Sequence, residues 1–257
     1  MRRNWRVLLA AAALLGATRA AAAGDPYPPE PDPSITQDET SPSAETSFPV
    51  TLGTYSTTLI GSLPARTGNI RLAARALDGL VLDPGQVLSF NRAVGPRTVE
   101  RGYQPAPVIL REARDVQLGG GVCQVASTLL DAALLAGLRA VERHRHSYPV
   151  DYIPLAQDAT IVWGAKDLKI RNSLGQRVRL RVDVLGTTLT VRVEGEEPAG
   201  EDFDLETSER DAPGGEGGTP GHEVDLYRIR RVDGEEVARD LVHRDLYPPA
   251  IARGSGQ

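Results

Sequence analysis

The sequence is poor in cysteine. Cys123 is the single cysteine among 257 residues, which excludes an internal disulfide and any zinc site built from Cys-x-x-Cys pairs. A lone thiol is either buried as a small, inert hydrophobic side chain or used for its chemistry. The surroundings of Cys123 are therefore the first thing to predict.

Long apolar runs are also scarce. Three arginines precede the apolar run Val7–Ala17, which is well short of the roughly 20 residues that a membrane-spanning helix needs. Ala21–Ala23 then offers a small-residue cleavage site. This order is typical of a secretory signal peptide over residues 1–23. We expect a secreted or periplasmic protein with no stable transmembrane anchor after cleavage.

Basic side chains are outnumbered by acidic ones. Without residues 1–23, which hold four arginines and no acidic residue, the chain has 25 Lys and Arg against 34 Asp and Glu. Affinity for nucleic acids rests on neutralising phosphates with basic side chains. The charge balance therefore argues against a nucleic acid partner.

Composition divides the rest of the chain into a patterned core between hydrophilic stretches. Residues 24–47 are rich in Pro, Ser and acidic side chains, which predicts a disordered tether. Residues 48–194 carry the hydrophobic patterning of one ordinary core domain. Residues 195–222 are hydrophilic and end in a Gly- and Pro-rich run, which indicates a mobile loop. Residues 223–257 are expected to form a β-hairpin and a tail.

Hydrophobic periodicity predicts an α+β domain in which two helices pack on a mostly antiparallel sheet. One helix is expected over Ile70–Leu80, after Gly68 and Asn69, and the other begins at Val122 and ends at Gly137. A hairpin around Asp233 and Gly234 should dock on the core, because a lone hairpin is barely stable in water. Further strands are expected at Gln86–Asn91, Asp158–Gly164, Leu168–Asn172, Arg177–Leu185 and Thr188–Glu194.

A run of three glycines places Cys123 in the first turn of the second helix. There the unpaired backbone N–H groups and the positive end of the helix dipole favour a thiolate, which is the reactive form of cysteine. Gly119, Gly120 and Gly121 also keep the backbone slim, so that a substrate can approach closely. In the alternative interpretation the glycines simply allow tight packing.

Two histidines and an acid follow the cysteine along the chain. His144 and His146 are two residues apart, so on an extended segment they point to the same side. Asp158 opens the next predicted strand. A thiol nucleophile needs an imidazole that takes or shares its proton and an acid that holds the imidazole in one tautomer. The order predicts Cys123 as nucleophile, His146 or His144 as base, and Asp158 as orienting acid, with His146 favoured.

The same side chains have two other interpretations. The histidines, flanked by arginines, are also typical of a solvated polar strand face. Cys123, His144 and His146 could instead bind zinc, with Asp158 as a fourth ligand, although the spacing is long and no Cys-x-x-Cys pair is present. The leading hypothesis requires no cofactor.

Motifs spread over roughly residues 70–175 occur together in the order typical of one known family. They are Gly85–Asn91, Val94–Thr98, Arg101–Tyr103, Gly119–Leu129, Glu142–Ser147 and Asp158–Thr160. Together they resemble the VanW family. The tail, Tyr227–Glu236 through Asp245–Pro248, resembles the strand-rich ending that often closes VanW-like proteins and is reminiscent of G5-type modules.

The resemblance implies an exported bacterial protein of the cell envelope, associated with peptidoglycan and named after vancomycin resistance. The leading hypothesis is a thiol-dependent acyl transferase or amide hydrolase that acts on peptidoglycan peptides; the alternative is a non-catalytic wall-binding or assembly module. Tyr152 and Trp163 are either core residues or platforms on which sugars stack. The candidate substrate-binding residues are Gly119, Gly120, Gly121, Gln124, Arg97 and Tyr152.

Overall fold

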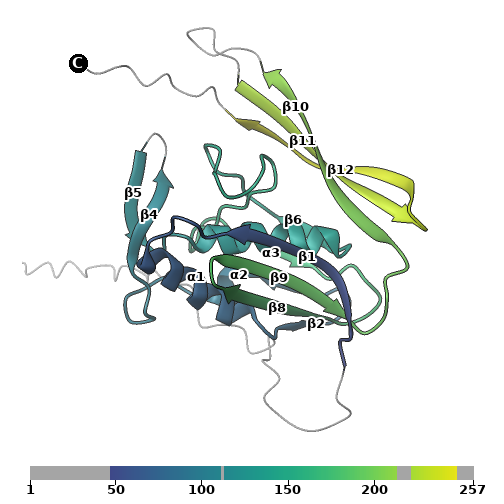
Figure 1. Ribbon diagram of the computed structural model, residues 1–257, viewed down its shortest axis with the longest axis horizontal. Coiled ribbons are helices and arrows are strands. Elements are labelled where there is room, and N and C mark those ends of the chain that lie inside the picture. Colours follow the sequence, from purple (N-terminus) through teal and green to yellow (C-terminus); the bar gives the residue numbers. More distant parts are fainter. Residues whose placement is uncertain (1–46, 111–112, 213–220, 248–257) are drawn as a thin grey trace, which may run out of the picture.

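The computed structural model of the chain describes residues 47–110, 113–212 and 221–247 (Figure 1). The predicted signal peptide lies outside these ranges, as do nearly all of the predicted tether, the Gly- and Pro-rich run and the C-terminal tail. Within the described ranges, no helix has the length and apolar character that crossing a membrane requires.

The described residues form an α+β fold, as predicted, with three helices and twelve strands. The helices are α1 (Pro64–Leu77), α2 (Phe90–Val94) and α3 (Val122–Leu135). The strands of the core are β1 (Val50–Thr58), β2 (Val81–Leu82), β3 (Val87–Ser89), β4 (Pro105–Leu110), β5 (Ala113–Leu118), β6 (Arg139–Glu142), β7 (Lys169–Arg171), β8 (Val178–Leu185) and β9 (Thr188–Gly195). The last three strands are β10 (Asp202–Ala212), β11 (Gly221–Val232) and β12 (Glu235–Tyr247).

Antiparallel sheets surround helix α3. The sheet β1-β9-β8-β2 packs against α1 and α3, and a smaller sheet, β3-β7-β6, continues the core. The strands β10-β11-β12 form a third sheet, which contacts α3 through β10. Figure 1 shows this C-terminal sheet above α3 and the β4-β5 hairpin projecting beside α1. Helix α3 therefore lies between the core sheet and the C-terminal sheet.

The interior position of α3 follows from its composition. Val122 and all residues from Gln124 to Leu134 are buried, so Cys123 is the one partly exposed residue before Leu135. Gly53 lets β1 approach the end of the helix, since a Cβ built on it would lie 2.5 Å from the Ala136 nitrogen. Up to Leu134, the helix is thus packed on all sides except at Cys123.

Several predicted elements are confirmed. The predicted cysteine helix is α3, and β7, β8 and β9 lie within one or two residues of their predicted bounds. The predicted hairpin is β11-β12, and its turn residues Asp233 and Gly234 both have positive φ, 51° and 83°. Positive φ at both positions is what a tight turn between twisted strands requires.

Other predictions are wrong in part. Helix α1 begins at Pro64, before the expected start, because proline is well tolerated at the first helical position. The strand expected over Gln86–Asn91 ends at Ser89, whose hydroxyl accepts from the Arg92 N–H and caps α2.

The strand expected over Asp158–Gly164 does not form. The Ala159 N–H donates to the Ser127 hydroxyl, and the Thr160 N–H donates to the His144 carbonyl. A tight turn closed by Val162 and Lys166 follows. The backbone of this segment is therefore satisfied by scattered partners and not by a neighbouring strand.

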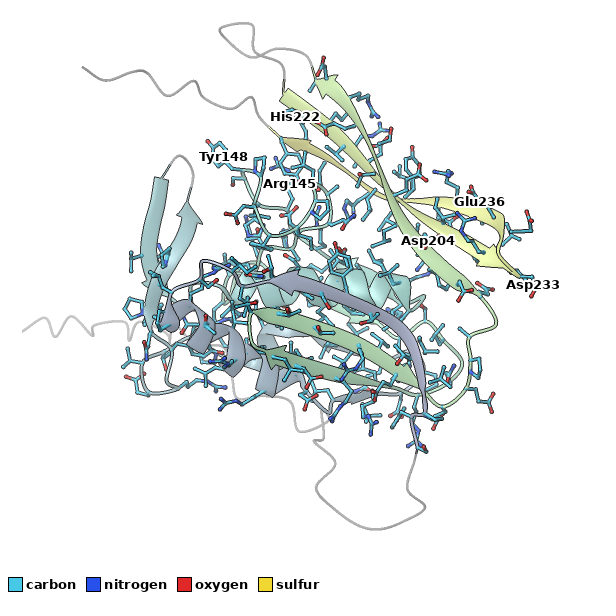
Figure 2. All side chains as sticks on the ribbon, viewed as in Figure 1. Arg145, Tyr148, Asp204, His222, Asp233 and Glu236 are labelled. Carbon is cyan, nitrogen blue, oxygen red and sulfur yellow. The ribbon has the colours of Figure 1, made fainter. Side chains whose placement is uncertain are left out.

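The loop predicted over residues 195–222 contains strand β10. Its inward side chains include Phe203 and Leu205, whereas the charged residues around them face solvent. Figure 2 shows Asp204 of β10 and Glu236 of β12 on the outside of this sheet. Charged side chains are common on edge strands, which they protect from pairing with other chains. Because the charged residues of this strand are so many, its short alternation of apolar side chains is hard to recognise in the sequence.

The C-terminal sheet is attached to the core by hydrogen bonds to buried groups. The Tyr247 hydroxyl accepts from the Ala156 N–H at 2.9 Å and donates to the Asp158 carboxylate at 2.8 Å. Nε2 of His243 donates to the Ala156 carbonyl at 2.6 Å, and Arg228 donates to the Leu138 carbonyl at 2.9 Å. The sheet is thus docked on the core, as expected for an ending that cannot be stable alone.

Two Gly→Ala substitutions should change stability in opposite directions. Gly53→Ala places a Cβ against the backbone of α3 and should lower the free energy of unfolding by about 1–3 kcal/mol. Gly68→Ala, inside α1 with open space around the new Cβ, should raise it by up to about 1 kcal/mol. Urea unfolding measures both, and equal effects of the two substitutions would contradict this packing.

Removing the Tyr247 hydroxyl should weaken the docking of the C-terminal sheet. A hydrogen bond to a charged group contributes about 1.5–3 kcal/mol, so Tyr247→Phe should lower the free energy of unfolding by that amount. Tyr148→Phe is the matched control, because the Tyr148 hydroxyl has no hydrogen-bond partner among the described residues. If both variants unfold at the same urea concentration as the wild type, the described contact does not stabilise the fold.

Candidate thiol site

Cys123 lies on the wall of an open cavity of about 500 Å³. It is the second helical residue of α3, after the N-cap Gly121, which has φ 103°. The thiol lies 3.7 Å from the Ile161 carbonyl oxygen. Its position in the first turn is as predicted, and the residue is partly exposed at the cavity wall.

The three glycines permit the close packing around this helix start. Gly119 and Gly121 have positive φ and line the cavity, whereas Gly120 is buried. A Cβ on Gly120 would lie 2.4 Å from the Ala106 carbonyl oxygen. Backbone approach therefore requires glycine at position 120, and backbone conformation favours it at the other two.

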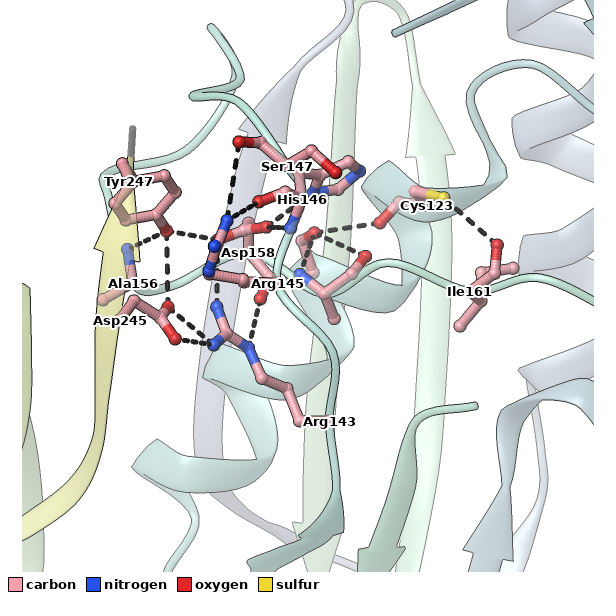
Figure 3. Close-up of polar contacts among 12 residues, drawn as sticks. Cys123, Arg143, Arg145, His146, Ser147, Ala156, Asp158, Ile161, Asp245 and Tyr247 are labelled. Atoms are coloured by element: carbon pink, nitrogen blue, oxygen red, sulfur yellow. Dashed lines mark hydrogen bonds and ion pairs between the residues drawn. The ribbon is translucent and has the colours of Figure 1, made fainter. Parts of the chain in front are cut away.

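The imidazole of His146 lies between the thiol and a buried acid. Nδ1 of His146 donates to Oδ2 of Asp158 at 2.6 Å, and the His146 backbone N–H donates to the same oxygen at 2.6 Å. His146 and Cys123 both line the cavity, and the neighbouring imidazole lowers the pKa of the thiol. The arrangement has the order thiol, imidazole, carboxylate (Figure 3).

The Asp158 carboxylate is held by three side chains. Oδ1 accepts from Nη2 of Arg143 at 2.9 Å and from the Tyr247 hydroxyl at 2.8 Å, while Oδ2 accepts from His146. Nη1 of Arg143 also contacts both oxygens of Asp245 at 2.6 and 2.7 Å. Figure 3 shows Tyr247 and Asp245 reaching this network from β12. The C-terminal sheet therefore contributes directly to the surroundings of the acid.

This network moves the pKa values of the base and the acid apart. Burial lowers the pKa of His146, but the hydrogen bond to Asp158 and the nearby Cys123 outweigh this effect and raise it to about 9. Burial raises the pKa of Asp158, but the hydrogen bond from His146 and the charge of Arg143 lower it to about 2. At neutral pH the carboxylate is ionised and the imidazole carries a proton.

The same contacts favour the thiolate. Burial raises the pKa of the Cys123 thiol, but the neighbouring His146, the Ile161 carbonyl contact and the charge of Arg97 lower it below its ordinary value. A positive helix end adds to this effect. The surroundings of Cys123 therefore shift the thiol towards its reactive thiolate form.

His144 does not share this cavity. Its Nε2 donates to Glu142 at 3.1 Å, and both line a second cavity of about 600 Å³, together with Arg145 and Lys166. The expectation that both histidines point to one side is wrong, because β6 ends at Glu142 and the following residues are not in a sheet. Within the described ranges, no group of three or more His, Cys, Asp or Glu side chains could hold a metal ion.

Two other predicted substrate-binding residues are engaged with the protein itself. Gln124 is buried and donates to the Thr57 hydroxyl at 3.0 Å and to the Thr58 carbonyl at 2.9 Å. Arg97 lies over the rings of Trp163 and Phe90 and donates to the Asn91 side chain. Gln124 forms part of the cavity wall, and Arg97 affects the thiol through its charge.

Tyr152 lines the cavity, as a substrate-binding side chain would. Its ring makes an edge contact with His146, with ring centroids 6.5 Å apart. Its hydroxyl is buried without a hydrogen-bond partner among the described residues. Burial and the Cys123 charge raise the pKa of this hydroxyl, so it stays a neutral donor.

Sequence reasoning misses Arg143, Asp245, Tyr247 and Arg66. Arg143 lies directly before the predicted bases, in a run in which arginine and histidine alternate. This alternation is the sequence signal that could have identified Arg143 as part of the site. Asp245 and Tyr247 are far along the chain, and no local pattern links them to Asp158. Arg66 comes from the first turn of α1 and lines the cavity.

Comparison with known proteins identifies relatives of this chain. A family model described as VanW like protein matches residues 65–194, half of the chain. The chain is 39% identical over 140 residues to the uncharacterized protein YoaR of Bacillus subtilis, covering 54% of this chain and 46% of that protein. It is 32% identical over 109 residues to the vancomycin B-type resistance protein VanW of Enterococcus faecalis, covering 40% of each.

The chain therefore spans less than half the length of either of these curated relatives. No solved structure matches it. The matched residues 65–194 contain Cys123, His146 and Asp158, whereas β10, β11 and β12 lie beyond them. The resemblance of the tail to G5-type modules stays a prediction. On the family match, this chain belongs to the VanW-like family.

Proposed function

We propose that this protein is an exported cell-envelope enzyme, a thiol-dependent acyl transferase or amide hydrolase that acts on peptidoglycan peptides. The observation that carries the proposal is that Cys123 and His146 line one open cavity and that the His146 imidazole is hydrogen bonded to Asp158. A buried thiol with no neighbouring base would be inert. Here the thiol has a base, the base has an orienting acid, and a substrate can approach the sulfur.

Each side chain has a definite role in the proposed reaction. The Cys123 thiolate attacks the carbonyl carbon of an amide, and the imidazolium of His146 donates its proton to the departing amine. The C–N bond breaks and a thioester to the sulfur remains. His146 then takes a proton from an attacking amine or water, which replaces the sulfur and regenerates the thiolate. Asp158 holds the imidazole in one orientation throughout.

The cellular setting of the proposal rests on family and sequence. One relative is named a vancomycin B-type resistance protein, which supports a role at the cell envelope. Residues 1–23 supply the basic and apolar pattern of an export signal. Peptidoglycan peptides contain amide bonds that are accessible outside the cytoplasmic membrane. We take them as the substrate class to test first.

Turnover is tested with a panel of peptidoglycan fragments. Wild type should release or exchange part of a peptide stem, detected by mass spectrometry, whereas Cys123→Ala should show no turnover because the nucleophile is absent. Cys123→Ser is the second variant, since it keeps the size of the side chain. Equal binding of fragments by wild type and Cys123→Ala, with no turnover, would favour the wall-binding module instead.

The choice between the two histidines is tested by alkylation of the thiol. In wild type, iodoacetamide should react with Cys123 well below the pH at which free cysteine reacts, because the thiol pKa is lowered. His146→Ala and His146→Gln should move the rate profile to higher pH, since a thiol pKa that rises by about one lowers the thiolate fraction about tenfold at a fixed acidic pH. His144→Ala is the matched control and should keep the wild-type profile. A changed profile in the His144 variant alone would reverse the assignment.

The proposed mechanism uses no metal. Purified protein should retain its thiol reactivity and its melting temperature after treatment with a chelator, because no step requires an ion. Elemental analysis provides the independent measurement. About one equivalent of zinc, with a fall in melting temperature on chelation, would favour the zinc-site alternative.

A further inference from the structure

The cavity beside Cys123 contains a guanidinium that the proposed reaction does not use. Nη2 of Arg66 donates to Oε1 of Gln124 at 2.7 Å, and Gln124 is fixed in turn by Thr57 and Thr58. Gly121 makes room for Arg66, since a Cβ there would lie 2.9 Å from Cγ and 3.2 Å from Nη1 of Arg66. Arg66 is thus held against the backbone two residues before the nucleophile.

Arg66 gives this part of the cavity wall a fixed positive charge. A guanidinium has five N–H donors, and the side chain that accepts from Nη2, Gln124, is neutral. The Arg66 guanidinium also lies over the Tyr152 ring, with its Cζ 5.9 Å from the ring centroid. Asp151 is an acidic side chain of the same wall, but it is exposed, so water and salt screen its charge. An anion that enters the cavity therefore meets a well-positioned cation.

Two hydroxyls of the cavity that Arg66 lines lack partners. Oη of Tyr152 and Oγ1 of Thr160 are buried and have no hydrogen-bond partner among the described residues. Both side chains line the same cavity as Arg66 and Cys123. Buried polar atoms are nearly always hydrogen bonded, so these two hydroxyls are donors available to a ligand that enters the cavity.

We propose that Arg66, Tyr152 and Thr160 form a subsite for a carboxylate of the acyl donor, adjacent to the carbonyl group that Cys123 attacks. A planar guanidinium matches the two oxygens of a carboxylate, and hydroxyls supply the remaining donors. The walls around this subsite include the apolar Ile60, Leu63 and Val150, which suit an aliphatic chain. The assignment of the ligand to the acyl donor rests on the proposed function; the preference for a carboxylate does not.

Two alkylating reagents of nearly equal size test the subsite without any substrate. Iodoacetate carries a carboxylate, whereas iodoacetamide is neutral; with either, the thiolate forms an S–C bond and iodide leaves with the electrons of the C–I bond. The measured quantity is the ratio of the two alkylation rates for Cys123, relative to the same ratio for free cysteine. Wild type should favour iodoacetate on the order of tenfold.

Arg66→Gln should abolish most of this preference and leave the iodoacetamide rate close to that of wild type. Arg66→Lys should retain part of it, because lysine keeps the charge and loses the planar donor pair. Arg71→Gln, an exposed position on the same helix, is the control variant and should behave as wild type. Melting temperatures show whether each variant is folded.

The outcomes of this alkylation test can be distinguished from those of the turnover test. An unchanged ratio in Arg66→Gln, or no preference in wild type, overturns the carboxylate subsite even if peptide turnover is found. Loss of the preference in Arg66→Gln supports the subsite even if the peptide panel shows no turnover. An equal fall in both rates in Arg66→Gln, with the ratio unchanged, would mean that Arg66 acts on the thiol itself, which also contradicts the proposal.

Discussion

A carboxylate buried away from water must be stabilised by hydrogen-bond donors. The site depends on which donors stabilise the Asp158 carboxylate. This residue is 2% exposed, and its carboxylate accepts hydrogen bonds from four groups. Two belong to His146, one to Arg143 and one to Tyr247. Arg143 is shared with Asp245, so one buried charge fixes the segment after β6 and the end of β12 together. The orientation of the imidazole is a consequence of that compensation.

A second buried acid shows how much the donors matter. Asp131 of α3 is fully buried, and its carboxylate oxygens have no hydrogen-bond partner among the described residues. Burial and the nearby charge of Asp158 raise the pKa of Asp131 well above its ordinary value, although Arg143 opposes this. The pKa values of Asp131 and Asp158 are therefore shifted in opposite directions. Separated pKa values of neighbouring titratable groups are typical of functional sites.

Sequence reasoning can predict the elements whose signals are local. The glycines before Cys123, the turn at Asp233 and Gly234, and the alternation in β8 and β9 each act within a few residues, so the sequence is enough to predict them. Strand β10 escapes this reasoning because its charged residues mask a short apolar alternation. Tyr247 cannot be linked to Asp158, because a separation of 89 residues leaves no periodic trace. The choice of His146 over His144 likewise depends on where β6 ends.

The attachment of β12 to the site has a consequence for the order of folding. The contact between Tyr247 and Asp158 closes a long stretch of chain, and contacts of high sequence separation form late because their loop-closure entropy must first be overcome. The thiol, the imidazole and the acid all lie within the family-matched residues, yet the last donor to the acid arrives from the far end of the chain. Such an ordering leaves the surroundings of the Cys123 thiol incomplete while the protein is still folding, when a reactive thiolate would be most exposed to oxidation.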